Sequence, residues 1–188
     1  MIKQVKEDIL NVINQALSAI ESNDVVKLRD ISNETLHSSS IFQDENAISI
    51  ATVCYALSKI FERTQYKYYK DWGIFYENCS SNLKNAKSFL EKDNVKEYQN
   101  SIKNILNVID KLSSNLKKYV KEVIEQAQIA KGSRLYEHGI SIGRTAELLG
   151  VSKWELMDYA GKTGISDVEE NISMDINKRI KFARSLFV

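Results

Sequence analysis

A set of side chains between positions 144 and 162 has the chemistry that proteins use to contact duplex DNA. If the second of two short helices begins at Ser152, its first turns present hydroxyl, cationic and apolar groups to a major groove. Basic side chains in the same stretch neutralise phosphates, which supplies affinity without base recognition. The predicted DNA-contacting residues are Arg144, Thr145, Ser152, Lys153, Trp154, Met157, Asp158 and Lys162.

The same helix has features that suit other uses. Glu155 and Asp158 add negative charge, and the helix carries no Asn, Gln or Arg for a bidentate contact with a base. An outward Trp154 also suits a protein contact, because tryptophan is frequent among the residues that dominate protein–protein binding. A protein-docking surface and a purely structural unit are therefore the alternatives to DNA binding.

The helix-turn-helix that positions these side chains is predicted from residues 140–165, ISIGRTAELLGVSKWELMDYAGKTGI. Ala146 is small enough to lie where the two helices cross. Gly150 ends the first helix, which begins near residue 141, because glycine enters the left-handed region without a Cβ clash. Ser152 and Glu155 form a capping box at the start of the second helix. A small core is expected from Leu148, Leu149, Val151 and Leu156.

The segment 135–165 resembles a family of small bacterial and archaeal helix-turn-helix proteins proposed as antitoxins of PIN-domain ribonucleases. It covers about a sixth of the chain. The resemblance implies DNA-binding autoregulation and a toxin partner, and the extra helical residues before it could supply dimerisation, ligand sensing or partner binding. The matching residues are Leu135, Tyr136, Ile140, Ser141, Gly143, Ala146, Glu147, Leu148, Gly150, Ser152, Trp154, Glu155, Gly164 and Ile165.

A second segment, Ser32-Asn33-Glu34-Thr35-Leu36-His37, resembles the Arg-Asn-x-x-x-His element of the HEPN ribonucleases, which are also helical bundles. Histidine can act as a general acid or base near neutral pH. Ser32 stands where that family has arginine, so His37 as an ordinary helix residue and an inactive dimerising bundle are the alternatives. The chain has no Gly-rich phosphate loop, no metal-spaced His/Cys cluster and no nucleophile with a base partner. We therefore predict a protein that is not an enzyme and needs no cofactor.

Two further groups of side chains could contact nucleic acid. Aromatic residues at 66, 68, 69, 72, 75 and 76 lie among basic residues at 63, 67 and 70, a mixture that can stack on single strands. Packing of a helix end is the favoured interpretation. Basic residues between 178 and 184 could touch phosphates, although a solvated helix face is the default. His138 is expected at a helix C-terminus, where a cationic group is favoured.

Composition excludes several classes of protein. Lys and Arg total 26 against 25 Asp and Glu, so the net charge is only +1 and any nucleic-acid contact must be local. The 2 cysteines are far apart, which argues against a disulfide framework and fits a reducing compartment. The N-terminal segment lacks the apolar core of a signal peptide, and no run approaches the ~18 apolar residues of a membrane span. We expect a soluble, cytoplasmic protein without a membrane partner.

Apolar spacing predicts helices throughout the chain. The segment 22–24 is expected to separate the first two helices, Gly73 to mark a bend or loop, and 92–94 to separate the next two. Apolar residues from Ile102 to Val123 alternate three and four apart, which fits either a coiled coil between chains or, as we favour, packing within one bundle. The predicted helices cover residues 2–20, 25–41, 44–69, 75–90, 95–130 and 131–138, followed after the helix-turn-helix by a capping box at 166–169 and a helix from 172 to 187.

These observations predict an all-α protein with two domains. Residues 1–130 form a helical bundle for dimerisation or partner binding, and residues 131–188 form a helix-turn-helix domain with a C-terminal helix. Six of the 7 glycines follow residue 131, and this change in composition sets the boundary. The predicted function is a homodimeric DNA-binding transcriptional regulator of double-stranded DNA. The alternatives are an antitoxin-like module that binds a protein partner and a HEPN-like RNA-binding protein.

Overall fold

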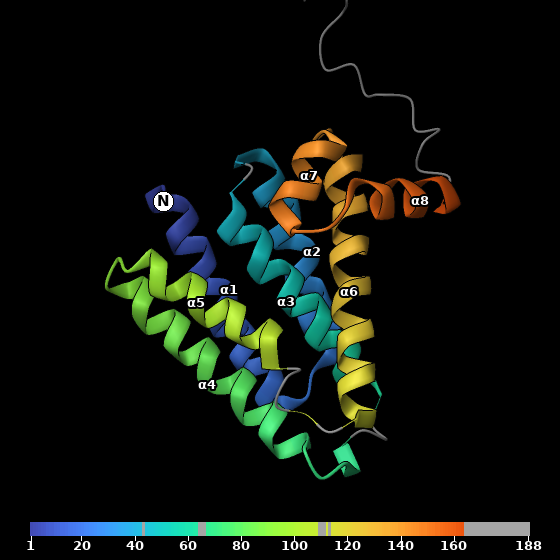
Figure 1. Ribbon diagram of the computed structural model, residues 1–188. Helices are drawn as coiled ribbons and strands as arrows, with labels where there is room; N and C mark the ends of the chain where they lie inside the picture. Colours follow the sequence, from blue (N-terminus) through green and yellow to red (C-terminus); the bar gives the residue numbers. More distant parts are fainter. Residues whose placement is uncertain (43, 64–66, 109–111, 113, 164–188) are drawn as a thin grey trace, which may run out of the picture.

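The computed structural model describes residues 1–42, 44–63, 67–108, 112 and 114–163. Within these residues the chain forms eight helices and no strand, which agrees with the predicted all-α class (Figure 1). The helices are α1 (Lys3–Ser22), α2 (Val25–Phe42), α3 (Glu45–Glu62), α4 (Trp72–Glu91), α5 (Val95–Leu106), α6 (Ser114–Glu137), α7 (Ile142–Leu149) and α8 (Lys153–Thr163).

The first break in the chain follows from local backbone chemistry. Helix α1 ends at Asn23, which adopts the left-handed conformation with φ of 54°. The Lys27 amide donates to Asp24 Oδ1 at 2.9 Å, so Asp24 caps the first turn of α2. The predicted break at 22–24 is therefore confirmed.

Helix α3 is the central element of the bundle. It packs against α1, α2, α5, α6 and α7, and its buried side chains lie on several faces. At its start, Asp44 Oδ1 accepts hydrogen bonds from the amides of Asn46 and Ala47, at 2.9 and 3.1 Å.

Two predicted boundaries around the following connection were wrong. The predicted helix 44–69 ends at Glu62, because Arg63 has extended backbone. Gly73 lies in the first turn of α4 rather than in a loop. The rings of Trp72 and Phe75, near the start of α4, pack against Phe61 near the end of α3, so the chain turns back between them.

The predicted single helix over residues 95–130 was also wrong. Helix α5 ends at Leu106, and α6 begins at Ser114. The apolar residues of the predicted seam nevertheless stay inside one chain: Ile102, Ile105 and Leu116 are buried in the main core. Val108 and Leu112, which lie between the two helices, are buried there as well. The spacing of apolar residues shows which positions are buried. It does not show where the chain changes direction between two helices.

Helix α6 joins the bundle to the last two helices without interruption. Its C-terminal turns cover residues predicted to form a separate helix at 131–138, so the predicted boundary near residue 130 falls inside a continuous helix (Figure 1). A small second core brings together side chains from α2, α3, α6, α7 and the turn before α7. Its buried members are Leu36, Ile48, Ala51, Leu135, Ile140 and Leu149.

The predicted capping box at 166–169 and the predicted helix from 172 to 187, with its basic residues, lie outside the described residues. None of the helices in the described part of the chain combines the length and apolar composition that a membrane-spanning helix needs.

Candidate nucleic-acid interface

Helices α7 and α8 are joined by a tight turn built from local interactions. Gly150 has φ of +67°, and the Val151 amide donates to the Ala146 carbonyl at 3.1 Å. The Glu155 amide donates to Ser152 Oγ at 3.2 Å, and the Ser152 amide donates to Glu155 Oε2 at 2.9 Å. These two reciprocal bonds are the predicted capping box. Hydrogen bonds from the Ser152 side chain and from its backbone amide to the Glu155 carboxylate lower the pKa of that carboxyl, because both stabilise its charged form.

The pair of helices sits on α6 at Gly132, which the sequence analysis counted only among the glycines that set the domain boundary. A Cβ added to Gly132 would lie 2.3 Å from Leu156 Cδ2 and 3.1 Å from Leu149 Cδ1. Gln128, one turn earlier in α6, donates to the Leu149 carbonyl at 3.2 Å. Gly132 therefore permits the close approach of α7 and α8, which is a different role from ending a helix.

The structure divides the predicted DNA-contacting residues into exposed and buried ones. Ser152, Lys153, Trp154, Met157 and Asp158 are all exposed at the beginning of α8. The exposed fractions of Trp154 and Met157, 78% and 50%, are large for apolar residues. In Figure 1, α8 projects sideways from α6, away from the helices of the main bundle.

Three predicted contacts need separate comment. Arg144 is exposed and forms an ion pair with Glu147 at 2.9 Å. Thr145 is 0% exposed, which is incompatible with a surface contact in this chain; it faces the Gly132 side of α6. Its Oγ1 is buried and has no hydrogen-bond partner. The Lys162 side chain lies outside the described part of the structure.

Charges around the start of α8 are mixed. Lys153 lies along α7, because its Nζ would be 3.5 Å from a Cβ placed on Gly143. Arg144, in the next position of α7, is a second exposed basic residue of the hairpin. Glu147 and Glu155 are close by, but the first pairs with Arg144 and the second is held by the Ser152 cap. The hairpin therefore offers two basic side chains next to an exposed helix start.

A buried lysine of α6 lies against α2 and α3. Lys131, next to Gly132 in α6, is only 2% exposed. Its Nζ donates to Asn33 Oδ1 at 2.9 Å and lies 4.3 Å from the centroid of the Tyr55 ring. Burial, and then the charge of Arg134, lower the pKa of Lys131 to about 8. Lys131 thus connects α6 to both α2 and α3.

The side chains of the HEPN-like segment, residues 32–37, make packing contacts rather than the Arg–His arrangement that the motif implies. Ser32, at the position of the family arginine, is buried and donates to the Ala51 carbonyl at 2.6 Å. Asn33 accepts the Lys131 hydrogen bond. The His37 ring contacts His138, with centroids 5.1 Å apart, and His138 immediately follows α6 as expected. The segment therefore contributes to packing between α2, α3 and α6.

Aromatic residues after α3 mostly pack together. Phe61 contacts Trp72, Phe75 and Tyr76 edge-on or tilted, with centroids between 5.3 and 6.3 Å apart. Tyr68 is exposed, whereas residue 66 lies outside the described residues. These contacts agree with packing of a helix end, which was the favoured interpretation.

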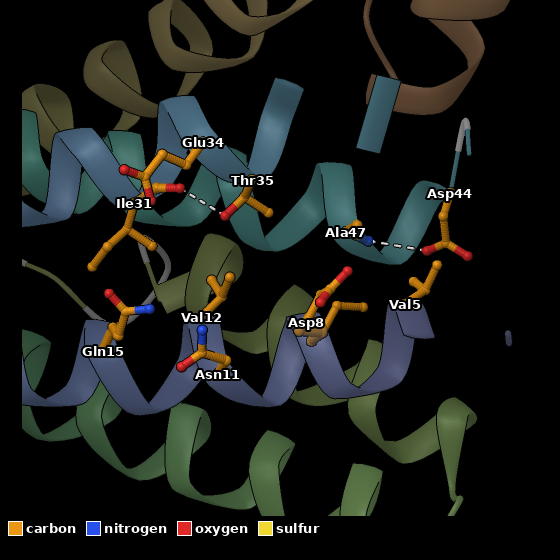
Figure 2. Close-up of a pocket in the computed structure, with 11 residues that line it drawn as sticks. Val5, Asp8, Asn11, Val12, Gln15, Ile31, Glu34, Thr35, Asp44 and Ala47 are labelled. Atoms are coloured by element: carbon orange, nitrogen blue, oxygen red, sulfur yellow. Dashed lines mark hydrogen bonds between the residues drawn. The ribbon is translucent and has the colours of Figure 1, made fainter. Parts of the chain in front are cut away.

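A pocket of about 150 Å³ lies between α1, α2 and the start of α3. Figure 2 shows Asp8, Asn11 and Gln15 of α1 opposite Glu34 of α2, with Asp44 at one end. Asp8 accepts a hydrogen bond from Gln4 at 3.0 Å, and Asp44 caps α3, so two of the three carboxylates are already engaged. Within the described chain, no three His, Cys, Asp or Glu side chains converge to hold a metal ion.

The two cysteines are structural. Cys54 and Cys79 are both buried and unpaired. Burial raises the pKa of Cys54 to about 12 and that of Cys79 further still, so neither thiol forms a thiolate near neutral pH.

The described residues thus contain one exposed hairpin with a capped helix start, built on a rigid bundle. Comparison of the chain with protein-family models, curated proteins and solved structures found no match.

Proposed function

We propose that this protein is a DNA-binding transcriptional regulator whose α8 helix enters the major groove. The observation that carries the proposal is the exposed beginning of α8, where Ser152, Lys153, Trp154 and Met157 are all accessible to solvent. In helix-turn-helix proteins the N-terminal residues of the second helix meet base edges, while the first helix crosses the phosphate backbone. Arg144 of α7 and Lys153 of α8 are exposed basic side chains that would neutralise phosphates.

Rigid support of the hairpin favours this use. Gly132 and Gln128 hold α7 and α8 against α6, and Leu149 belongs to the same small core as Leu36 and Ile48 of the bundle. A reading helix that is held on fixed elements loses little conformational freedom on binding, which favours affinity. Pairing of two bundles would place two such helices about 34 Å apart, in successive major grooves.

The test is the binding of the full chain to a duplex fragment from the region upstream of its own gene, measured by fluorescence polarisation over a range of salt. We expect tighter binding than to a shuffled duplex of equal length, with steep weakening as salt rises. Lys153→Ala should flatten the log–log salt slope by about 0.9, the release expected for one phosphate contact.

Lys118→Ala is the matched control. It removes the same charge from an exposed position near the beginning of α6, at the end of that helix opposite α7 and α8 in Figure 1. It should leave the salt slope unchanged. Equal binding to the native and shuffled duplexes, or an equal effect of the two substitutions, would contradict the proposal.

A protein-docking role is the second candidate, favoured by one observation. Trp154 and Met157 are large, exposed apolar side chains one helical turn apart, flanked by the acidic Glu155 and Asp158. Tryptophan in such a position is typical of residues that dominate protein interfaces.

Tryptophan emission separates the two candidates, because the chain has only 2 tryptophans. Trp72→Phe retains an aromatic ring beside Phe61 and leaves Trp154 as the single reporter. A change in emission on addition of the duplex supports DNA binding. A change only on addition of the protein encoded by the neighbouring gene supports docking.

A further inference from the structure

The two histidines of this chain are 101 positions apart in sequence, yet their rings are in contact. The chain has 2 histidines in total, His37 in α2 and His138 just after α6. Their ring centroids are 5.1 Å apart, and the ring planes meet at 61°. Both residues are exposed, so the pair is accessible from solvent.

The backbone on both sides of this pair is held by buried neighbours. Leu36 precedes His37, and Leu135 and Ile140 flank His138; all three belong to the small core between α2, α6 and α7. The His138 amide donates to the Arg134 carbonyl at 3.1 Å, and Gly139 takes a left-handed turn immediately afterwards. The separation of the two imidazoles is therefore set by packed elements rather than by mobile loops.

We propose that His37 and His138 together bind a late first-row divalent cation, with Zn²⁺ as the reference ion. Imidazole nitrogen is a preferred ligand of Zn²⁺ at about 2.0–2.1 Å, and two imidazoles on one tetrahedral ion have ring centroids roughly 5 Å apart. The observed separation matches this geometry.

The local charges are compatible with a cation. Arg134, one turn before His138, is compensated by Glu137 at 2.9 Å, and Glu34 lies one turn before His37 in α2. No third protein ligand converges on the pair within the described residues, so water would fill the remaining coordination positions. A site of this kind binds reversibly, and an ion there would connect α2 directly to the turn that begins α7.

Calorimetric titration of the full chain with ZnCl₂ in a non-chelating buffer tests the proposal. We expect one equivalent to bind, with His37→Gln and His138→Gln each weakening the affinity at least tenfold. The double variant provides the background from carboxylates and the N-terminal amine. Circular dichroism checks that each variant is folded.

The ring resonances of the two histidines supply a second readout, since no other imidazole is present. Both should change along one shared titration curve and return on addition of EDTA. Binding no stronger than that of the double variant would overturn the proposal. Retained affinity in either single variant, or two independent curves, would also overturn it. The experiment contains no DNA, so its failure leaves the proposed function untouched.

Discussion

The contact between Gly132 and the hairpin allows a quantitative prediction about how α7 and α8 are attached. In Gly132→Ala the new Cβ would lie 2.3 Å from Leu156 Cδ2. Carbon atoms in contact prefer about 3.5 Å or more, so the hairpin or Leu156 must move by roughly 1.2 Å. Overpacking of this kind costs about 1–3 kcal/mol. Replacing glycine by alanine inside a helix stabilises the folded state by about 1 kcal/mol through helix propensity.

Gly161→Ala is the matched control, because a Cβ at Gly161 of α8 meets nothing within 4 Å. Gly161→Ala gains the higher helix propensity of alanine, and its new Cβ overlaps no neighbouring atom. The difference in unfolding free energy between the two alanine variants therefore isolates the steric cost, about 1–3 kcal/mol. For a chain of this length it corresponds to about 2–12 °C in Tm, measured by differential scanning calorimetry.

Hydrogen exchange locates the effect. In Gly132→Ala the amides of α7 and α8 should exchange faster than in the wild type, whereas those of α1 and α4 should not change. Equal Tm values for the two variants would refute the argument that Gly132 supports the hairpin. Faster exchange throughout the bundle would refute its local character.

Three further predictions concern named side chains. Lys131→Met should abolish a rise in stability between pH 8 and 10.5, where the unfolded chain holds a proton that folded Lys131 has lost. The pKa difference between the folded and unfolded states makes this rise in unfolding free energy about 3 kcal/mol. It is measured by chemical denaturation of the wild type and the variant at each pH. Thr145→Val should stabilise the protein by about 1 kcal/mol in the same assay, because it removes a buried hydroxyl without a partner, and should leave duplex affinity unchanged. Ser152→Ala should cost about 1 kcal/mol through loss of the cap and return the pKa of Glu155 toward its ordinary value in an NMR titration; an unchanged Glu155 pKa would contradict the capping box.

Much of the hairpin could be predicted from sequence because its determinants are local. The left-handed Gly150 and the bonds between Ser152 and Glu155 involve residues no more than three positions apart, so the type and spacing of side chains are sufficient. The exposure of Trp154 was predicted from the same helical spacing. Thr145 was placed on the surface because its position on α7 was judged without α6, which covers it.

Predictions that depended on distant residues were less successful. The apolar spacing between residues 95 and 130 is shared by α5, the following turn and α6, so it suggested one helix where the chain forms two. Gly132 was counted only among the glycines that set the domain boundary, although it lies within α6 and its lack of a Cβ permits close packing. Neither the break between α5 and α6 nor the packing role of Gly132 can be recognised from the residues next to it in sequence.

By itself, the sequence determined the all-α class, the main helical segments with their buried faces, and the chemistry of the turn before α8. These depend on backbone chirality, capping bonds and helical periodicity, all of which act over a few residues. Only the tertiary structure decided that α6 continues into the hairpin, that Thr145 is covered, and that His37 meets His138. Those outcomes depend on close packing between residues up to 101 positions apart. The spacing of residue types along the chain does not show which distant surfaces fit together.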